Sequence, residues 1–227
     1  KNPGEIGIKE DYAQGYALEF FRSTPGHCLI GLTETIRKAR ENGDFTIPRN
    51  QFIYIKTADG MLLANNTSRI VNIDASDPFQ LSKGLEEGYL QVEQLMDFMH
   101  KYVPGFENAV VSDISPTLGV RETRHFQGIR RLTKEEMYAG LQDEQAIALC
   151  GYNVDIHAGR GDHIDLTPLE RAFGLPYGCF VARDVENLFL AGRTLSVDST
   201  VFAAARVMGP LMAAAQGIPC GSDVMAR

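Results

Sequence analysis

The sequence contains no C-x-x-C pair, and this absence excludes the zinc ribbons and thioredoxin-type redox motifs that depend on one. A chain of 227 residues can bury a core without a disulfide framework. We therefore expect buried free thiols at the four scattered cysteines, Cys28, Cys150, Cys179 and Cys220.

The sequence also has no basic block and no long apolar run. The formal net charge is -7, with 22 Lys and Arg residues against 29 Asp and Glu residues, which disfavours nucleic acid and anionic membrane surfaces as partners. No apolar run approaches the roughly 18 residues of a membrane-spanning helix. We expect neither nucleic-acid nor membrane partners and a cytoplasmic location. The oligomeric state is open, a homo-oligomer included.

Local patterns predict an α+β first part. A helix is expected from a cap at Ser23 or Thr24 to a stop at Gly43. Residues 52–65 predict two or three antiparallel strands around an Asp59-Gly60 turn.

A long amphipathic helix is expected next, because apolar residues recur every three or four positions until Pro104-Gly105. Strands are expected in AVVSDIS (109–115) and LGVRETRHF (118–126). A short helix should begin with a capping box formed by Thr133 and Glu136. The stripe predicted for the buried face of the long helix is Leu81, Leu85, Tyr89, Val92, Met96, Met99 and Val103.

From about residue 145 the pattern becomes strand-rich. We expect a strand pair within 144–157, a loop over 158–168 and a strand within 173–181. A further strand is expected in NLFLAG (187–192), followed by one long helix over 199–216.

The stretch around Gly192 suggests a binding site. NLFLAG is continuously apolar, as in a strand covered on both faces, and a terminal glycine permits a sharp turn or a close ligand. A helix beginning near Ser199 offers free backbone N–H groups and a partial positive charge. Arg206 lies in an otherwise apolar helix, so it needs a carboxylate or a ligand as its partner.

Six motifs in order resemble the FAD-dependent oxidoreductase family of the glutathione-reductase-like flavoprotein class, distantly related to fumarate reductase flavoproteins. The resemblance implies an α/β (α+β) fold, with a substrate (cap) domain at 1–144 and a C-terminal strand–helix return segment of the FAD-binding domain at 145–227. The motifs are VPGFE (103–107), GVRETR (119–124), LTKEE (132–136), DIH (155–157), LPYGC (175–179) and a closing motif over 187–208.

The resemblance also implies the site and its chemistry. FAD is the expected cofactor, and a small organic substrate would pass a hydride to it. Arg121 and His157 are the expected catalytic residues, which would orient or deprotonate the substrate. The expected cofactor-binding residues are Gly192, Arg193, Ser196 and Arg206.

One motif of such flavoproteins is missing. The G-x-G-x-x-G turn that holds the ADP half of FAD does not occur, and Gly159-Arg160-Gly161 lacks the third glycine. The chain starts with KNPGEIG, without an initiator Met. We therefore expect a C-terminal portion of a longer flavoprotein that is inactive alone and binds FAD weakly or not at all.

Two alternatives remain open. The chain could be a non-catalytic binding or assembly module that keeps a remnant of the fold. A metal-dependent hydrolase built on Asp155, His157 and His163 is less favoured, because dense Asp/His runs are more often solvated loops. No metal site is therefore predicted.

Overall fold

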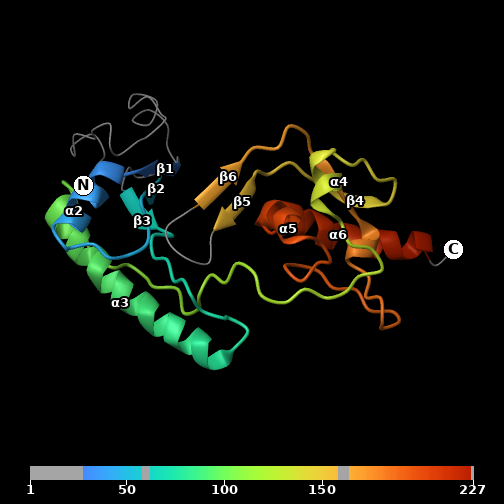
Figure 1. Ribbon diagram of the computed structural model, residues 1–227, viewed down its shortest axis with the longest axis horizontal. Helices are drawn as coiled ribbons and strands as arrows, with labels where there is room; N and C mark the ends of the chain where they lie inside the picture. The colour runs from blue at the N-terminus through green and yellow to red at the C-terminus, as the bar shows by residue number, and fades with distance from the viewer. Residues whose placement is uncertain (1–27, 58–61, 158–163, 226–227) are drawn as a thin grey trace. The chain divides into compact units, whose positions relative to one another are not determined.

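The computed structural model describes residues 28–57, 62–157 and 164–225, which form two compact units (Figure 1). The first unit runs to Gly119, and the second begins at Val120. Helices and small sheets are mixed in a way consistent with the predicted α/β class. The predicted boundary between residues 144 and 145 falls inside the second unit, and the two functional domains remain a prediction.

Among its described residues, the first unit contains a small antiparallel sheet and two helices. The strands lie in the order β1-β2-β3, with Leu29 opposite Tyr54 and Tyr54 opposite Ala64. The predicted antiparallel strands are therefore confirmed, while their Asp59-Gly60 turn lies outside the described residues. The elements are β1 (Cys28–Gly31), α2 (Thr33–Glu41), β2 (Phe52–Lys56), β3 (Leu62–Asn65) and α3 (Pro78–Tyr102).

The first helix is shorter than predicted. Its end is correct, since Gly43 follows with a positive φ of 80°, but α2 begins only at Thr33. Residues 28–31 form β1 instead, because the apolar run CLIG pairs with β2. Pairing across the sheet therefore outweighs the local helix signals.

Helix α3 is confirmed, but the predicted stripe is correct only near the end of the helix, where Met99 and Val103 are buried. Asp77 caps the helix by accepting a hydrogen bond from the Phe79 amide. Gln91, Leu95 and Phe98 are among its buried residues, whereas Tyr89 is 45% exposed. The face is rotated because the helix buries a polar side chain that an apolar pattern cannot include.

Gln91 explains this rotation. Its Oε1 accepts a hydrogen bond from the Arg69 amide at 2.7 Å, and its Nε2 donates to the Arg69 carbonyl at 2.9 Å. The Gln91 side chain thus pairs with the Arg69 backbone as a neighbouring strand would, and it provides a partner for both the amide and the carbonyl of Arg69. Farther along the helix Phe98 packs on Phe45 and Phe52, with ring centroids 5.0 and 5.2 Å apart.

The second unit contains two antiparallel strand pairs and three helices among its described residues. β4 pairs with β7, and β5 pairs with β6. The prediction that β4 and β5 form one pair is therefore wrong, and so is the loop predicted over 158–168, because its described part contains β6. The elements are α4 (Lys134–Tyr138), β4 (Ala146–Cys150), β5 (Val154–His157), β6 (Ile164–Thr167), β7 (Phe173–Pro176), α5 (Ser199–Ala205) and α6 (Met208–Met225).

Three predicted strands are not strands. Residues 109–115, 118–126 and 187–192, all of them described, contain no strand longer than a single bridge. In NLFLAG that bridge joins Phe189 to Val181, and Phe189 remains 39% exposed. An apolar run becomes a buried strand only where neighbouring strands complete its hydrogen bonds.

The helix predicted over 199–216 is divided into α5 and α6, which meet at 93°. Pro210 accounts for the division. A proline has no N–H to donate, and its ring would clash with the carbonyl of Arg206, four residues earlier. In the first turn of a new helix the same proline is well tolerated.

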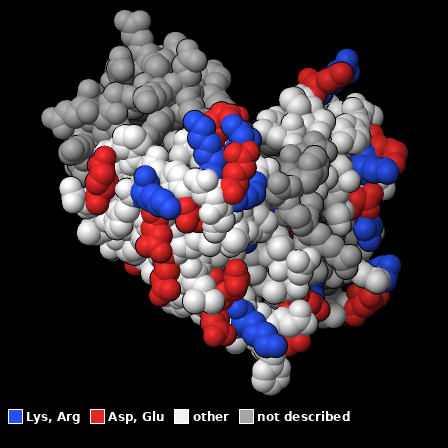
Figure 2. Space-filling view, turned by 60° about the vertical axis from the view of Figure 1, so that its left-hand side comes forward, with Lys and Arg blue, Asp and Glu red and all other residues white. Residues whose placement is uncertain are grey.

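Within the described residues, no single helix is long and apolar enough to cross a membrane; α5 and residues 208–219 pass that test only as a bent pair. Figure 2 shows acidic and basic side chains interspersed on the face in view.

Candidate functional site

Two segments of the second unit lie side by side and carry most of the predicted site. We call residues 120–132 the motif segment and residues 192–199 the closing segment. The Phe126 amide donates to the Thr194 carbonyl at 3.1 Å, and the Leu132 amide donates to the Ser196 carbonyl at 3.3 Å. Motifs far apart in the sequence therefore share one local structure.

Side chains reinforce this backbone pairing. The Arg193 guanidinium donates to the carbonyl oxygen of Val120. Arg131 Nε donates to Asp198 Oδ1 at 2.8 Å, just before α5. The closing segment is thus anchored near both of its ends.

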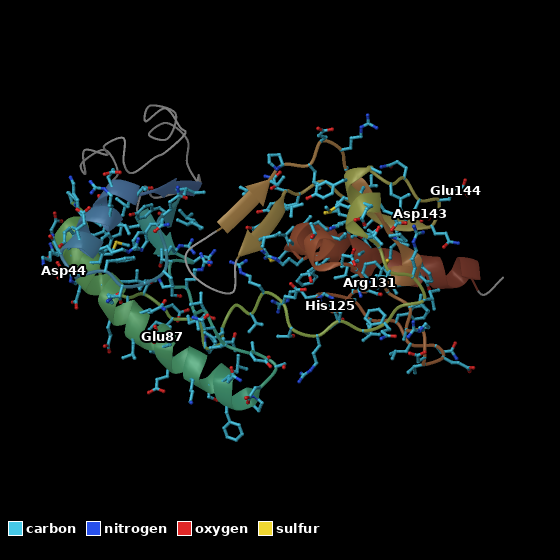
Figure 3. The ribbon with its side chains drawn as sticks, in the orientation of Figure 1. Asp44, Glu87, His125, Arg131, Asp143 and Glu144 are labelled. Carbon is cyan, nitrogen blue, oxygen red and sulfur yellow. The ribbon has the colours of Figure 1, made fainter. Side chains whose placement is uncertain are left out.

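A polar cluster joins the same two segments and was not predicted. His125 places Nδ1 2.8 Å from the Leu195 carbonyl oxygen and Nε2 2.9 Å from Glu122 Oε1 (Figure 3). Ser199 Oγ donates to the same carboxylate oxygen at 2.9 Å. No local pattern in the sequence marks Glu122 or its two partners.

The α5–α6 junction contains a buried ion pair. Arg206 Nη2 donates to Asp155 Oδ2 at 2.9 Å and to the Asp155 carbonyl oxygen at 2.8 Å. The two side chains are only 7% and 14% exposed. The expectation that Arg206 needs a partner is confirmed, and the partner is a carboxylate of this chain.

Arg121 lies in the electrostatic field of this pair. Burial lowers the pKa of Arg121, and repulsion from Arg206 and Arg193 lowers it further, while Asp155 and Tyr152 oppose the shift. Arg121 is nevertheless an exposed residue, so the desolvation of its guanidinium is far from complete. Among the described residues no hydrogen bond or ion pair is formed by Arg121.

The predicted cofactor-binding residues have different surroundings. Gly192 has a φ of 96°, and no described atom lies within 4 Å of where a Cβ would stand. Ser196 is only 5% exposed, with its Cβ 2.8 Å from the Cβ position built on Gly128. Gly192 is therefore explained by its backbone conformation, and Gly128 by close packing.

His157 is the last residue of β5, two positions after Asp155. His163, one of the three residues of the alternative metal-dependent hydrolase, lies outside the described residues. Among the residues that are described, no group of three His, Cys, Asp or Glu side chains could hold a metal ion. The catalytic assignments to Arg121 and His157 remain predictions.

Two of the cysteines are buried free thiols, as expected. Cys150 and Cys179 carry no disulfide, and burial raises the pKa of Cys179 to about 11. A thiol with so little thiolate is a poor nucleophile at neutral pH. A surface hollow of about 470 Å³ at residues 181–187 contains none of the predicted site residues.

Comparison with known proteins identifies a family. The family model described as FAD dependent oxidoreductase matches residues 20–220. No curated protein matches, and no solved structure matches. The matched range includes every residue of the predicted site.

Proposed function

Because the chain belongs to the FAD-dependent oxidoreductase family, we propose that it contributes the substrate-binding side of an enzyme that oxidises a small organic anion. FAD, when bound, would supply the hydride acceptor. The observation that supports this proposal is that Arg121 lies within electrostatic range of two other guanidinium groups, Arg193 and Arg206, and of one carboxylate, Asp155, which Arg206 already binds. Guanidinium groups in excess over carboxylates favour an anionic ligand.

The donors present suit the flavin end of the cofactor. Beside Gly192 there is open space, and Arg193 keeps exposed surface next to it, so these two residues would lie against the cofactor. Ser196 is buried, so it would act only by shaping the backbone of the closing segment. Arg206 would act through its bond to Asp155, which orders the α5–α6 junction.

Arg121 is the residue that we propose holds the substrate. It has no acceptor among the described residues, and repulsion by neighbouring guanidinium groups makes an added anion favourable. A bidentate carboxylate would satisfy its planar donor set. His157 would move a proton at the substrate, since imidazole exchanges protons near neutral pH.

The ADP half of FAD has no recognisable cradle in this sequence, which contains no G-x-G-x-x-G turn. We therefore propose that the 227-residue chain by itself binds FAD weakly or not at all and is inactive alone. Oxidation and FAD binding are therefore to be tested on the natural protein that carries this chain.

The test pairs substrate oxidation with a change at Arg121. Small hydroxy and amino acids, and their neutral amides, are screened against a dye acceptor with the wild type and with Arg121→Gln. We expect Arg121→Gln to raise KM for the anionic substrate by about 10- to 100-fold, since a charge-assisted hydrogen bond is lost. The neutral amide should be little affected. Arg183→Gln, at an exposed arginine outside the site, is the control.

Two results would contradict the proposal. Equal losses for the anionic substrate and its amide would show that Arg121 does not recognise the charge. Colourless natural protein that oxidises none of these compounds would favour the non-catalytic binding module.

A further inference from the structure

The short connection between β4 and β5 is fastened to α5 and its end on both sides. Cys150, the last residue of β4, is fully buried, and its Sγ lies 3.5 Å from the Ala204 carbonyl oxygen. Asp155, the second residue of β5, accepts two hydrogen bonds from Arg206, the residue that follows α5. Tyr152, in the middle of this connection, is therefore held at a defined place.

The hydroxyl of Tyr152 is not used within the described part of the chain. The residue is 43% exposed, and its hydroxyl forms no hydrogen bond with any residue that the structure describes. A single exposed tyrosine is ordinary on a protein surface, so its exposure alone indicates no function. Its neighbour distinguishes Tyr152 from other exposed tyrosines.

That neighbour is Arg121, which lies within electrostatic range of Tyr152 and is exposed as well. The chain on either side of Arg121 is fixed, because the Val120 carbonyl and the Glu122 carboxylate both accept hydrogen bonds from the closing segment. A guanidinium and a phenol, neither of them hydrogen-bonded to a described residue, thus lie near each other on two fastened stretches of the chain.

We propose that Tyr152 determines the specificity of the proposed site: its hydroxyl binds a hydroxyl or amino group that the substrate carries next to the carboxylate held by Arg121. This inference rests on the proposed function and narrows it. The small organic anion becomes a hydroxy acid or an amino acid.

The two side chains divide the recognition between them. A guanidinium only donates hydrogen bonds, and its planar set of donors matches a carboxylate. A phenol hydroxyl both donates and accepts, so it can bind an alcohol or an amino group. Arg121 therefore reads the charge of the substrate, and Tyr152 reads its second polar group.

Tyr152 should act on selectivity more than on overall affinity. Water satisfies the Tyr152 hydroxyl in the free protein. A ligand without the second polar group would displace this water and leave the hydroxyl without a partner. One neutral hydrogen bond corresponds to a difference of about tenfold in affinity.

The test measures the binding of two carboxylates to the natural protein that carries this chain. Isobutyrate and hydroxyisobutyrate differ only in a hydroxyl on the carbon next to the carboxylate. Hydroxyisobutyrate has no hydrogen on that carbon, so it binds without giving up a hydride. Isothermal titration calorimetry gives both affinities and does not depend on flavin colour. We expect the wild type to bind hydroxyisobutyrate about tenfold more tightly.

Tyr152→Phe keeps the ring and removes only the hydroxyl. We expect this variant to bind both compounds equally, with the affinity for isobutyrate unchanged from the wild type. That unchanged affinity shows that the variant is folded and that the carboxylate is still held. Tyr138→Phe, at a tyrosine of α4 that is 54% exposed, is the matched control and should keep the tenfold preference.

A preference that survives in Tyr152→Phe would overturn the proposal. A wild type that binds both compounds equally would overturn it without any variant. Arg121→Gln separates these results from the proposed function, because it should weaken the binding of both compounds by the same factor. If it leaves isobutyrate binding unchanged, or if the wild type binds neither compound, the proposed anion site itself is wrong.

Discussion

Removing Arg206 should destabilise the second unit strongly. Its guanidinium makes two hydrogen bonds to Asp155, and both side chains are almost fully buried. Arg206→Met keeps most of the side chain's apolar volume but leaves the Asp155 carboxylate without this cation. Loss of one partner from a buried ion pair destabilises a protein by about 3–5 kcal/mol.

The assay is urea unfolding followed by circular dichroism, with the free energy of unfolding extrapolated to water. Arg183→Met is the matched control, because Arg183 is 54% exposed and pairs with its neighbour Asp184. An exposed pair contributes at most about 1 kcal/mol. In the double variant Arg206→Met with Asp155→Asn, the loss of unfolding free energy should be smaller than the sum of the losses in the two single variants. Each single substitution already removes the same interaction.

Similar losses of unfolding free energy in Arg206→Met and Arg183→Met would refute this prediction. That result would mean that solvent reaches the Arg206–Asp155 pair as freely as it reaches a surface pair.

Three further predictions concern the packing of the two units. In urea unfolding, Gly128→Ala should destabilise the protein by about 1–3 kcal/mol, because the added Cβ would come within 3 Å of two backbone oxygens. Gly209→Ala, where a Cβ would point into open space, should be neutral or stabilising. Burial raises the pKa of Cys179 to about 11, whereas the thiol has an ordinary pKa in the urea-unfolded chain. At about pH 8 folded Cys179 should therefore react with iodoacetamide at least a hundredfold more slowly than unfolded Cys179. Equal rates would contradict its burial. Gln91→Ala should lower the free energy of unfolding by about 2–4 kcal/mol, because it removes both hydrogen bonds to the buried Arg69 backbone. A loss no larger than that of Glu93→Ala, at an exposed position of the same helix, would show that the loop before α3 is secured in another way.

Features set by near neighbours were predictable from the sequence. The capping box of Thr133 and Glu136 is present, because both partners lie within one turn of helix. The length of α3 was predicted for the same reason. Its buried face was predicted only near the end of the helix, at Met99 and Val103, because Gln91 is buried through a partner 22 residues away.

Features that depend on distant partners were missed. NLFLAG has the composition of a buried strand, but a single bridge is all the strand pairing that it makes with the described part of the chain. His125 lies 70 residues from the Leu195 carbonyl that fixes its ring, and no local pattern reports such a contact. Arg206 was the exception, since a long cation within an apolar helix implies a partner even when that partner is unknown.

The cofactor content of the natural protein that carries this chain tests the central claim most directly. Its visible absorption and the FAD released on denaturation give the molar ratio of FAD to polypeptide. We predict a ratio near one, with the flavin colour lost when an anionic substrate is added without oxygen. A ratio near zero in freshly purified, folded protein would contradict the assignment of the closing segment as part of a flavin site.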